Sequence, residues 1–223
     1  MLYAITDRRL YAGNEADALA RLVELAAIWA TNGVSYIQLR EKDLPAREQV
    51  KLTRAVVRAV SVKTIAPRVL VNGRVDVALA AEADGVHLPS GPDALSPEEV
   101  RRIFETAGRR RLPVISVSCH TIDEVTLARE QSPDCIVFAP VFEKVIREGV
   151  AIDAGDSEGG ASQLPGTGRA LLEQACRAAA PVGVFALGGV TAENAVDCLR
   201  AGAAGIAAIR LFQQPPSAWK YLA

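Results

Sequence analysis

The sequence contains few of the residues from which metal and redox centres are built. Only 2 histidines and 4 cysteines occur among 223 residues, and no two cysteines are spaced as a CxxC pair. This spacing excludes the common zinc and dithiol redox motifs. Three cysteines lie in apolar or alanine-rich segments and are expected in the core, whereas one follows a predicted strand and is a weaker case: Cys135, Cys176 and Cys198, then Cys119.

A charge bias and a long apolar run are also absent. The 25 Lys and Arg residues nearly cancel 26 Asp and Glu residues, so the net charge of −1 predicts no attraction to nucleic acid or to an anionic membrane surface. No stretch reaches the roughly 18 apolar residues of a membrane span. The N-terminal MLYAITDRRL lacks the basic and apolar regions of a signal peptide, and we expect a reducing, cytoplasmic location.

Short runs rich in Val and Ile alternate along the chain with longer segments of helical periodicity, as in successive βα units. Most of these runs are apolar at consecutive positions, which is typical of parallel strands buried on both faces. The eight predicted strands are Tyr3–Thr6, Tyr36–Arg40, Arg68–Asn72, Gly85–Pro89, Val114–Ser118, Cys135–Pro140, Val182–Gly189 and Gly205–Arg210.

Helices are predicted over Ala16–Thr31 and Arg47–Val60, and capping residues predict further helix starts at Ser96, Thr121 and Thr191. Eight strands, most of them followed by a helix, indicate a (β/α)8 barrel that spans residues 1–223 as one domain. A doubly wound open sheet is the alternative. It is less favoured because the turn after its first strand is normally rich in glycine, and residues 6–9 contain none.

Residues 141–168 break this rhythm. The segment is rich in Gly, Ala, Ser and Asp and shows no helical or strand periodicity. We expect a long loop after the sixth strand, lying as a mobile lid over the active face. A passive insertion is an equally good alternative, because surface loops tolerate extra length.

The carboxyl-terminal strand ends of such a barrel form its active face. Gln38, Arg40 and Lys42 alternate at the end of the second strand, so an amide and two cations share one side, where they suit phosphate oxygens. The turn at residues 188–189 is Gly-Gly before a helix start, which lets backbone N–H groups approach an anion. His87 and His120 lie near other strand ends, where a structural role is more common than a catalytic one.

Seven motifs follow one another over nearly the whole chain: YAITD at 3–7, IQLREK at 37–42, Asn72 with VHL at 86–88, VSCH at 117–120, PVF at 140–142, ALGGVTAEN at 186–194 and AGAAGIA at 201–207. In this order they resemble the thiamin phosphate synthase family, which includes the related thiazole tautomerases. The resemblance implies a (β/α)8 barrel that binds small phosphorylated thiazole and pyrimidine ligands.

In the family resembled, the synthase joins an aminopyrimidine pyrophosphate to a thiazole phosphate with Mg²⁺ and releases pyrophosphate. The resemblance assigns five side chains to the pyrimidine and its pyrophosphate: Gln38, Arg40, Lys42, Asn72 and Ser118. It assigns the backbone of the Gly188-Gly189 turn and the backbone near Ile209 to the thiazole phosphate.

The magnesium motifs of the synthases are altered. Gly73 follows Asn72, where the synthases have an Asp that binds Mg²⁺. After the fourth strand a Gly-Gln-Glu-Asp sequence is replaced by Pro-Ser-Gly-Pro at residues 89–92, and Asp93, one position further on, is the one metal candidate left. After the sixth strand the Pro-Thr-x-Thr-Lys sequence is replaced by residues 143–147, which leave Arg147 as the cation.

Residues 88–91 and 141–143 are similar instead to the thiazole tautomerases, which need no Mg²⁺. Their catalytic His corresponds to Pro140 here, so His120 is the candidate general acid or base, with Arg147 and Ser118 as further catalytic candidates. We therefore favour a tautomerase-like paralogue without a cofactor. A synthase that uses Mg²⁺ bound by Asp93, and a non-catalytic protein that binds thiazole or thiamin phosphate, are the alternatives.

Overall fold

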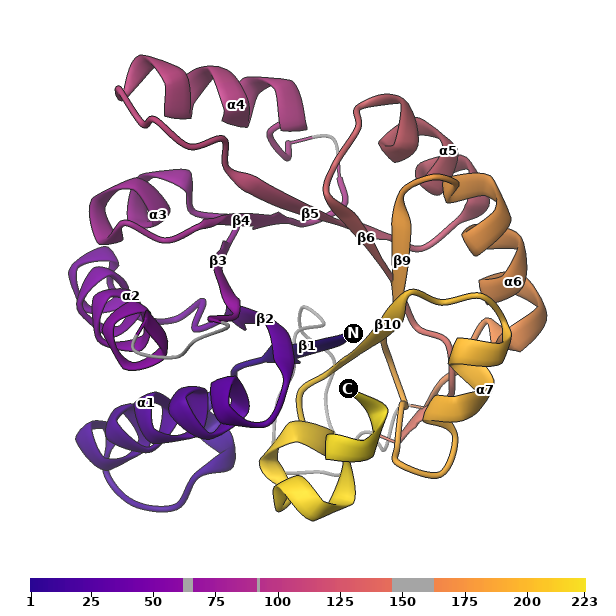
Figure 1. Ribbon diagram of the computed structural model, residues 1–223, viewed down its shortest axis with the longest axis horizontal. Coiled ribbons are helices and arrows are strands. Elements are labelled where there is room, and N and C mark those ends of the chain that lie inside the picture. The colour runs from indigo at the N-terminus through magenta and orange to yellow at the C-terminus, as the bar shows by residue number, and fades with distance from the viewer. Residues whose placement is uncertain (62–65, 92, 146–162) are drawn as a thin grey trace.

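Eight parallel strands close into a barrel in the computed structural model, which describes residues 1–61, 66–91, 93–145 and 163–223 (Figure 1). Each strand pairs with the next along the chain, and β1 pairs with the last strand to complete the ring. The strands are β1 Leu2–Ile5, β2 Val34–Leu39, β3 Arg68–Asn72, β4 Gly85–Leu88, β5 Val114–Cys119, β6 Cys135–Phe138, β9 Gly183–Ala186 and β10 Gly205–Ala208. The predicted (β/α)8 barrel is confirmed.

The consecutive apolar positions of the strands have the expected cause. Every residue of β1, β4, β6 and β10 is buried, because one face of each strand fills the barrel and the other packs under the helices. Seven strands end within two residues of the prediction. The exception is β9, which ends at Ala186 instead of Gly189 because Gly188 and Gly189 turn the chain with φ of +93° and +63°.

Seven α-helices of the described residues lie outside the barrel (Figure 1): α1 Glu15–Thr31, α2 Ala46–Ser61, α3 Val75–Ala81, α4 Pro97–Thr106, α5 Ile122–Glu130, α6 Gly168–Ala179 and α7 Ala195–Arg200. The predicted starts at Ser96 and Thr121 are confirmed as N-caps of α4 and α5. The capping residue predicted at Thr191 is wrong by three residues, because Thr191 and Asn194 first exchange hydrogen bonds in a turn, and Asn194 is the N-cap of α7. Among the described residues, no helix is long and apolar enough to cross a membrane.

After β10 the chain makes three short 3-10 turns, at Leu211–Gln213, Pro216–Ala218 and Lys220–Leu222, where an eighth α-helix would stand. The buried rings of Phe212 and Trp219 pack edge to face in this segment, with centroids 5.2 Å apart. From α1, the Nε1–H of Trp29 donates to the Phe212 carbonyl oxygen at 2.7 Å. The C-terminal segment therefore covers the barrel beside α1 (Figure 1).

The segment after β6 is only partly a loop. Lys144–Val145 (β7) pairs antiparallel with Gln163–Leu164 (β8), so the absence of strand structure predicted for residues 141–168 is wrong at both of these places. Two residues of β7 and β8 are too few to produce a periodic pattern that a sequence could reveal. Residues 146–162, which carry the predicted lid and Arg147, lie outside the described residues.

The cysteines pack largely as expected. Cys135 and Cys198 are buried and Cys176 is partly buried. Cys119, the weaker case, is also a core residue with 1% exposure, since its side chain lies on the outward face of β5 beneath the helices. Burial raises the pKa of the Cys119 and Cys135 thiols to about 12, so neither carries a thiolate near neutral pH.

The capping residues at the start of α4 can be tested for their contribution to stability. Ser96 accepts a hydrogen bond from Glu99 N–H, and the Glu99 carboxylate accepts one from Ser96 N–H, which is a complete capping box. We expect Ser96→Ala to lower the free energy of unfolding by about 1 kcal/mol, because it leaves a first-turn N–H without its partner. Urea unfolding followed by circular dichroism measures this change. Ser61→Ala, at the other end of a helix, is the control, and an equal loss in both variants would contradict the assignment.

Candidate functional site

A layer of polar side chains fills the barrel toward the carboxyl ends of its strands. His87 of β4 lies at its centre with 5% exposure. Its Nδ1 is 2.9 Å from Ser116 Oγ and its Nε2 is 3.0 Å from Ser118 Oγ, both of β5. Tyr3 of β1 donates its O–H to Ser116 Oγ at 3.2 Å. These four groups form a continuous hydrogen-bonded chain across the barrel.

The chain of hydrogen bonds has a direction. Because Tyr3 donates to Ser116, the Ser116 hydroxyl proton is available for His87 Nδ1. We therefore assign the imidazole proton to Nε2, which in this tautomer donates to Ser118 Oγ. The half-buried Ser118 is left with its own O–H to donate toward the mouth of the barrel. Burial, followed by the charge of Arg40, lowers the pKa of His87 to about 3, so the imidazole is neutral in this network.

Gln38 and Asn72 form a second polar pair in the same layer. Gln38 Nε2 donates to Asn72 Oδ1 at 2.9 Å. Gln38 is 1% exposed, and its Oε1 has no hydrogen-bond partner among the described residues. A buried amide oxygen without a partner is costly unless a bound molecule supplies a donor. The pair therefore leaves one buried acceptor without a donor from the described residues, the Gln38 Oε1, beside the amide group of Asn72 at the cavity.

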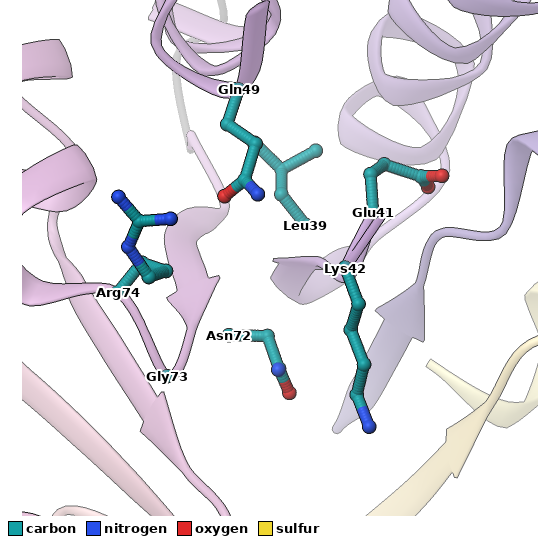
Figure 2. A pocket seen from close by; sticks show the side chains of 7 residues that line it. All are labelled: Leu39, Glu41, Lys42, Gln49, Asn72, Gly73 and Arg74. Atoms are coloured by element: carbon teal, nitrogen blue, oxygen red, sulfur yellow. The ribbon is translucent and has the colours of Figure 1, made fainter. Parts of the chain in front are cut away.

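A cavity of about 220 Å³ opens beside this pair, between the ends of β2 and β3 (Figure 2). Lys42 extends alongside Asn72, Gln49 reaches in from α2, and Arg74 stands on the opposite side from Lys42. Arg74 is held by a bidentate pair with Asp76 at 2.8 and 2.5 Å. The lining residues are Leu39, Glu41, Lys42, Gln49, Asn72, Gly73 and Arg74. Cations and amides around one hollow suit an anionic group.

The predicted binding residues of β2 and β3 thus lie in one region. Gln38 is buried in the barrel, Arg40 is half-buried and close enough for its charge to act on His87, and Lys42 is exposed at the cavity. Ser118 joins the same layer through His87. The roles assigned to these residues stay predictions.

The Gly188-Gly189 turn lies at another part of the rim and has a packing reason for its composition. A Cβ on Gly188 would lie 2.8 Å from Pro140 Cα, and one on Gly189 would lie 2.7 Å from Glu143 O. Phe142 N–H also donates to the Gly188 carbonyl oxygen at 3.0 Å. Ile209, after β10, packs with the interior apolar cluster. A phosphate site at this turn stays a prediction.

His120 lies outside the buried polar layer. Its side chain is exposed after β5, and its Nδ1 donates to the Ala139 carbonyl oxygen at 2.6 Å. Since a carbonyl oxygen only accepts, Nδ1 carries a proton, and Nε2 is the nitrogen left to exchange one with a ligand. Ala139 immediately precedes Pro140, so His120 is tied to the strand end where the resemblance expects a catalytic residue.

The residues present do not fit a Mg²⁺ site. In the described part of the chain, no three His, Cys, Asp or Glu side chains gather where they would hold a metal ion. Gly73 supplies no carboxylate, and Asp93 is exposed in the loop before α4, outside the set of residues that lines the cavity. Mg²⁺ in phosphate sites is normally held by one or two carboxylates beside the phosphates.

Sequence reasoning missed several residues of this region. Tyr3 looked like an ordinary strand residue, and its hydroxyl contact is set by packing across the barrel. Arg74 and Gln49 line the cavity because α2 and α3 begin beside it. An Arg directly after Asn72-Gly73 was the available signal for Arg74, since it too follows a strand end.

Comparisons with known proteins agree on one family. The family model described as thiamine monophosphate synthase matches residues 2–212. A putative thiamine-phosphate synthase of Geobacter sulfurreducens is 39% identical over 93% of this chain and 84% of its own length. A putative thiamine-phosphate synthase 2 of Aquifex aeolicus is 35% identical over 95% and 96%. The solved thiamine phosphate pyrophosphorylase from Pyrococcus furiosus superposes with a TM-score of 0.74 at 26% identity, covering 99% of this chain and 92% of that one.

The neutral imidazole of His87 predicts a pH dependence of stability. The pKa of His87 is depressed to about 3 in the fold, so below about pH 6.5 the unfolded chain binds a proton that the folded chain does not. This contribution is complete above about pH 6.5 and is lost as the pH falls toward 3. We expect His87→Gln to remove about 2 kcal/mol of the stability difference between about pH 7 and pH 4.5.

Urea unfolding at the two pH values measures that difference. The substitution also removes hydrogen bonds of His87, but it does so at both pH values. Their contribution therefore cancels when the free energies of unfolding at the two pH values are subtracted. His120→Gln is the matched control, because it removes the only other histidine, which is exposed. The stability difference between the two pH values should persist in this variant. A His87→Gln variant with the full wild-type difference would refute a neutral buried imidazole.

Proposed function

Because the chain belongs to the thiamine monophosphate synthase family, we propose that it binds a phosphorylated thiazole at the carboxyl-terminal mouth of the barrel and shifts a ring proton without Mg²⁺. The observation that carries this proposal is the donor set at the cavity. Gly73 stands beside Asn72, and the described residues contain no group of three or more His, Cys, Asp or Glu side chains that could hold a metal ion.

The polar layer supports binding of an uncharged ring. His87 is neutral and its neighbours are hydroxyls and amides, so this layer of the barrel offers hydrogen bonds without a net charge. Ser118 and Asn72 are available as donors to a ring nitrogen or to a phosphate oxygen. Lys42, at the rim, supplies positive charge for a phosphate.

The proton shift needs one group that gives and takes a proton. His120 is the candidate, because its Nδ1–H donates to the Ala139 carbonyl oxygen and its Nε2 is left to exchange a proton with the ligand. In the proposed step, neutral His120 accepts a proton from one ring position at Nε2. The resulting imidazolium returns a proton to the second position, which leaves the ring aromatic. The ring anion and the imidazolium form together and are neutralised together when the proton returns, so the net charge of the site is unchanged.

The synthase reaction is the second candidate, and one observation favours it. The Gln38–Asn72 pair and Lys42 are intact, and these are residues that the resemblance assigns to the pyrimidine and its pyrophosphate. Against it stands the loss of carboxylates, since leaving pyrophosphate gains charge that the missing metal would neutralise. Formation of thiamin phosphate that EDTA abolishes would establish this candidate and refute the first.

Ligand protection distinguishes the candidates directly. We expect the phosphate of 4-methyl-5-(2-hydroxyethyl)thiazole to raise the midpoint of thermal unfolding equally with Mg²⁺ and with EDTA, because side chains alone bind it. His120→Ala should keep this protection and abolish turnover of a non-aromatic isomer of the same thiazole phosphate. Full protection without turnover in the wild type would indicate a binding protein instead. Protection that requires Mg²⁺ would contradict the proposal.

Gly73 allows the metal argument to be tested in the opposite direction. Its φ is +65°, and an added Cβ would have Pro89 Cδ, 3.9 Å away, as its nearest contact. Gly73→Asp should therefore fold at a cost of about 1 kcal/mol for a left-handed residue. We expect it to make protection by inorganic pyrophosphate depend on Mg²⁺, measured as the shift in unfolding midpoint. Gly73→Asn, which has the same shape without charge, is the control, and equal behaviour of both variants would count against the argument.

A further inference from the structure

Glu41 stands between the two cations of the β2 end and points the opposite way. Its carboxylate is directed away from the cavity, whereas Lys42 reaches along Asn72 into it (Figure 2). The Glu41 side chain is only 3% exposed. A buried carboxylate directly between Arg40 and Lys42 calls for an explanation, because it opposes the charge of the proposed phosphate-binding cations.

The contacts of Glu41 tie its turn to the end of β1. Arg8 N–H donates to both carboxylate oxygens, at 3.3 and 3.2 Å, and Arg8 Nη1 donates to Oε2 at 3.2 Å. Asp43 completes the set with two hydrogen bonds from the Arg8 guanidinium, at 2.7 and 2.8 Å. Arg8 therefore binds the carboxylates of the two residues that flank Lys42, Glu41 and Asp43.

Thr6 makes a second connection between the same two segments. Its hydroxyl oxygen accepts from Arg40 N–H at 3.0 Å, and its O–H donates to the Glu41 carboxylate. Its own N–H donates to the Gln38 carbonyl oxygen at 3.0 Å, continuing the ladder of β1 and β2. Thr6 is 1% exposed. Thr6 thus fixes the backbone at residues 38 and 40, and Thr6 and Arg8 together hold the carboxylate of Glu41.

Stability alone does not account for this arrangement. Burial raises the pKa of the Glu41 carboxyl above its ordinary value, against the hydrogen bonds from Thr6 and Arg8. A buried ion pair of this kind contributes little compared with apolar side chains of the same volume. What it does supply is a unique backbone conformation, because each oxygen has a fixed donor.

We infer that Glu41 is a positioning residue, which acts with Thr6 and Arg8 to direct Arg40 and Lys42 at the phosphate of the ligand. The inference rests on the proposed function, in which Lys42 supplies positive charge for that phosphate, and it adds Arg40 as a second cation. Glu41 itself touches no ligand. Its carboxylate anchors the turn on the far side, so the side chains before and after it emerge toward the mouth.

The sign of one substitution separates positioning from electrostatics. Glu41→Gln removes a negative charge next to two cations, so the field alone would strengthen binding of an anion. If the carboxylate positions the cations, binding weakens instead. We expect the dissociation constant of inorganic pyrophosphate, measured by titration calorimetry in EDTA, to rise about tenfold, the equivalent of roughly one charge-assisted hydrogen bond.

Two further variants complete the test. Thr6→Val removes the second anchor with no change of charge or size, and the same weakening is expected. Glu15→Gln removes a carboxylate that lies 3.7 Å from Arg8 Nη2. This variant should bind pyrophosphate as tightly as the wild type or more tightly. Unfolding midpoints are recorded for each variant, so that binding is compared between folded proteins.

The outcomes separate the two proposals. Wild-type protein that binds neither pyrophosphate nor the thiazole phosphate overturns the proposed function and this inference with it. Wild-type binding with equal or tighter binding by Glu41→Gln and Thr6→Val overturns the positioning role alone. If Glu41→Gln does not fold, Thr6→Val decides by the same criterion. Weakening that appears equally in Glu15→Gln would show that the loss of binding is not specific to the Glu41 anchor and would also refute the inference.

Discussion

The hydrogen bonds between one neutral imidazole and two serines keep the centre of this barrel polar but uncharged. His87 is buried among Tyr3, Ser116 and Ser118, and its low pKa keeps the interior uncharged there. A protonated His87 would place an unpaired cation in a medium that stabilises charge poorly. Because the centre is neutral, the charged groups of the site are confined to the rim, where Arg40 and Lys42 follow β2 and Arg74 follows β3.

The rim in turn lacks a carboxylate at Gly73, which is one of two places where the magnesium motifs are altered. Gly73 adopts a left-handed conformation directly after Asn72, and its N–H donates to the His87 carbonyl oxygen at 2.8 Å. The turn is thereby anchored to β4, whatever residue occupies it. The loss of a carboxylate at this position changes the chemistry available at the cavity while the backbone keeps its place. Such a separation explains how members of one barrel family catalyse different reactions.

The sequence predicted the barrel well because strands buried on both faces leave an unmistakable pattern of consecutive Val and Ile residues. It predicted the positions of Gln38, Lys42 and Asn72 for a related reason, since strand ends of a barrel meet at one edge. It could not predict that Tyr3 would reach Ser116, because that contact joins strands 113 positions apart. Nor could it predict β7 and β8, whose pairing depends on how the chain returns from residues 146–162.

The base of that long segment has an evolutionary consequence. Thr167 N–H and its hydroxyl both donate to the Pro140 carbonyl oxygen, at 2.9 Å each, and Gly168 N–H donates to the Val141 carbonyl oxygen at 2.9 Å. The chain is thus closed on itself where it leaves and rejoins the barrel. Closing a loop costs only about 0.6 kcal/mol more for each doubling of its length. Insertions and deletions between these two ends would leave the eight strands undisturbed, which makes this the natural place for lineages to diverge in length.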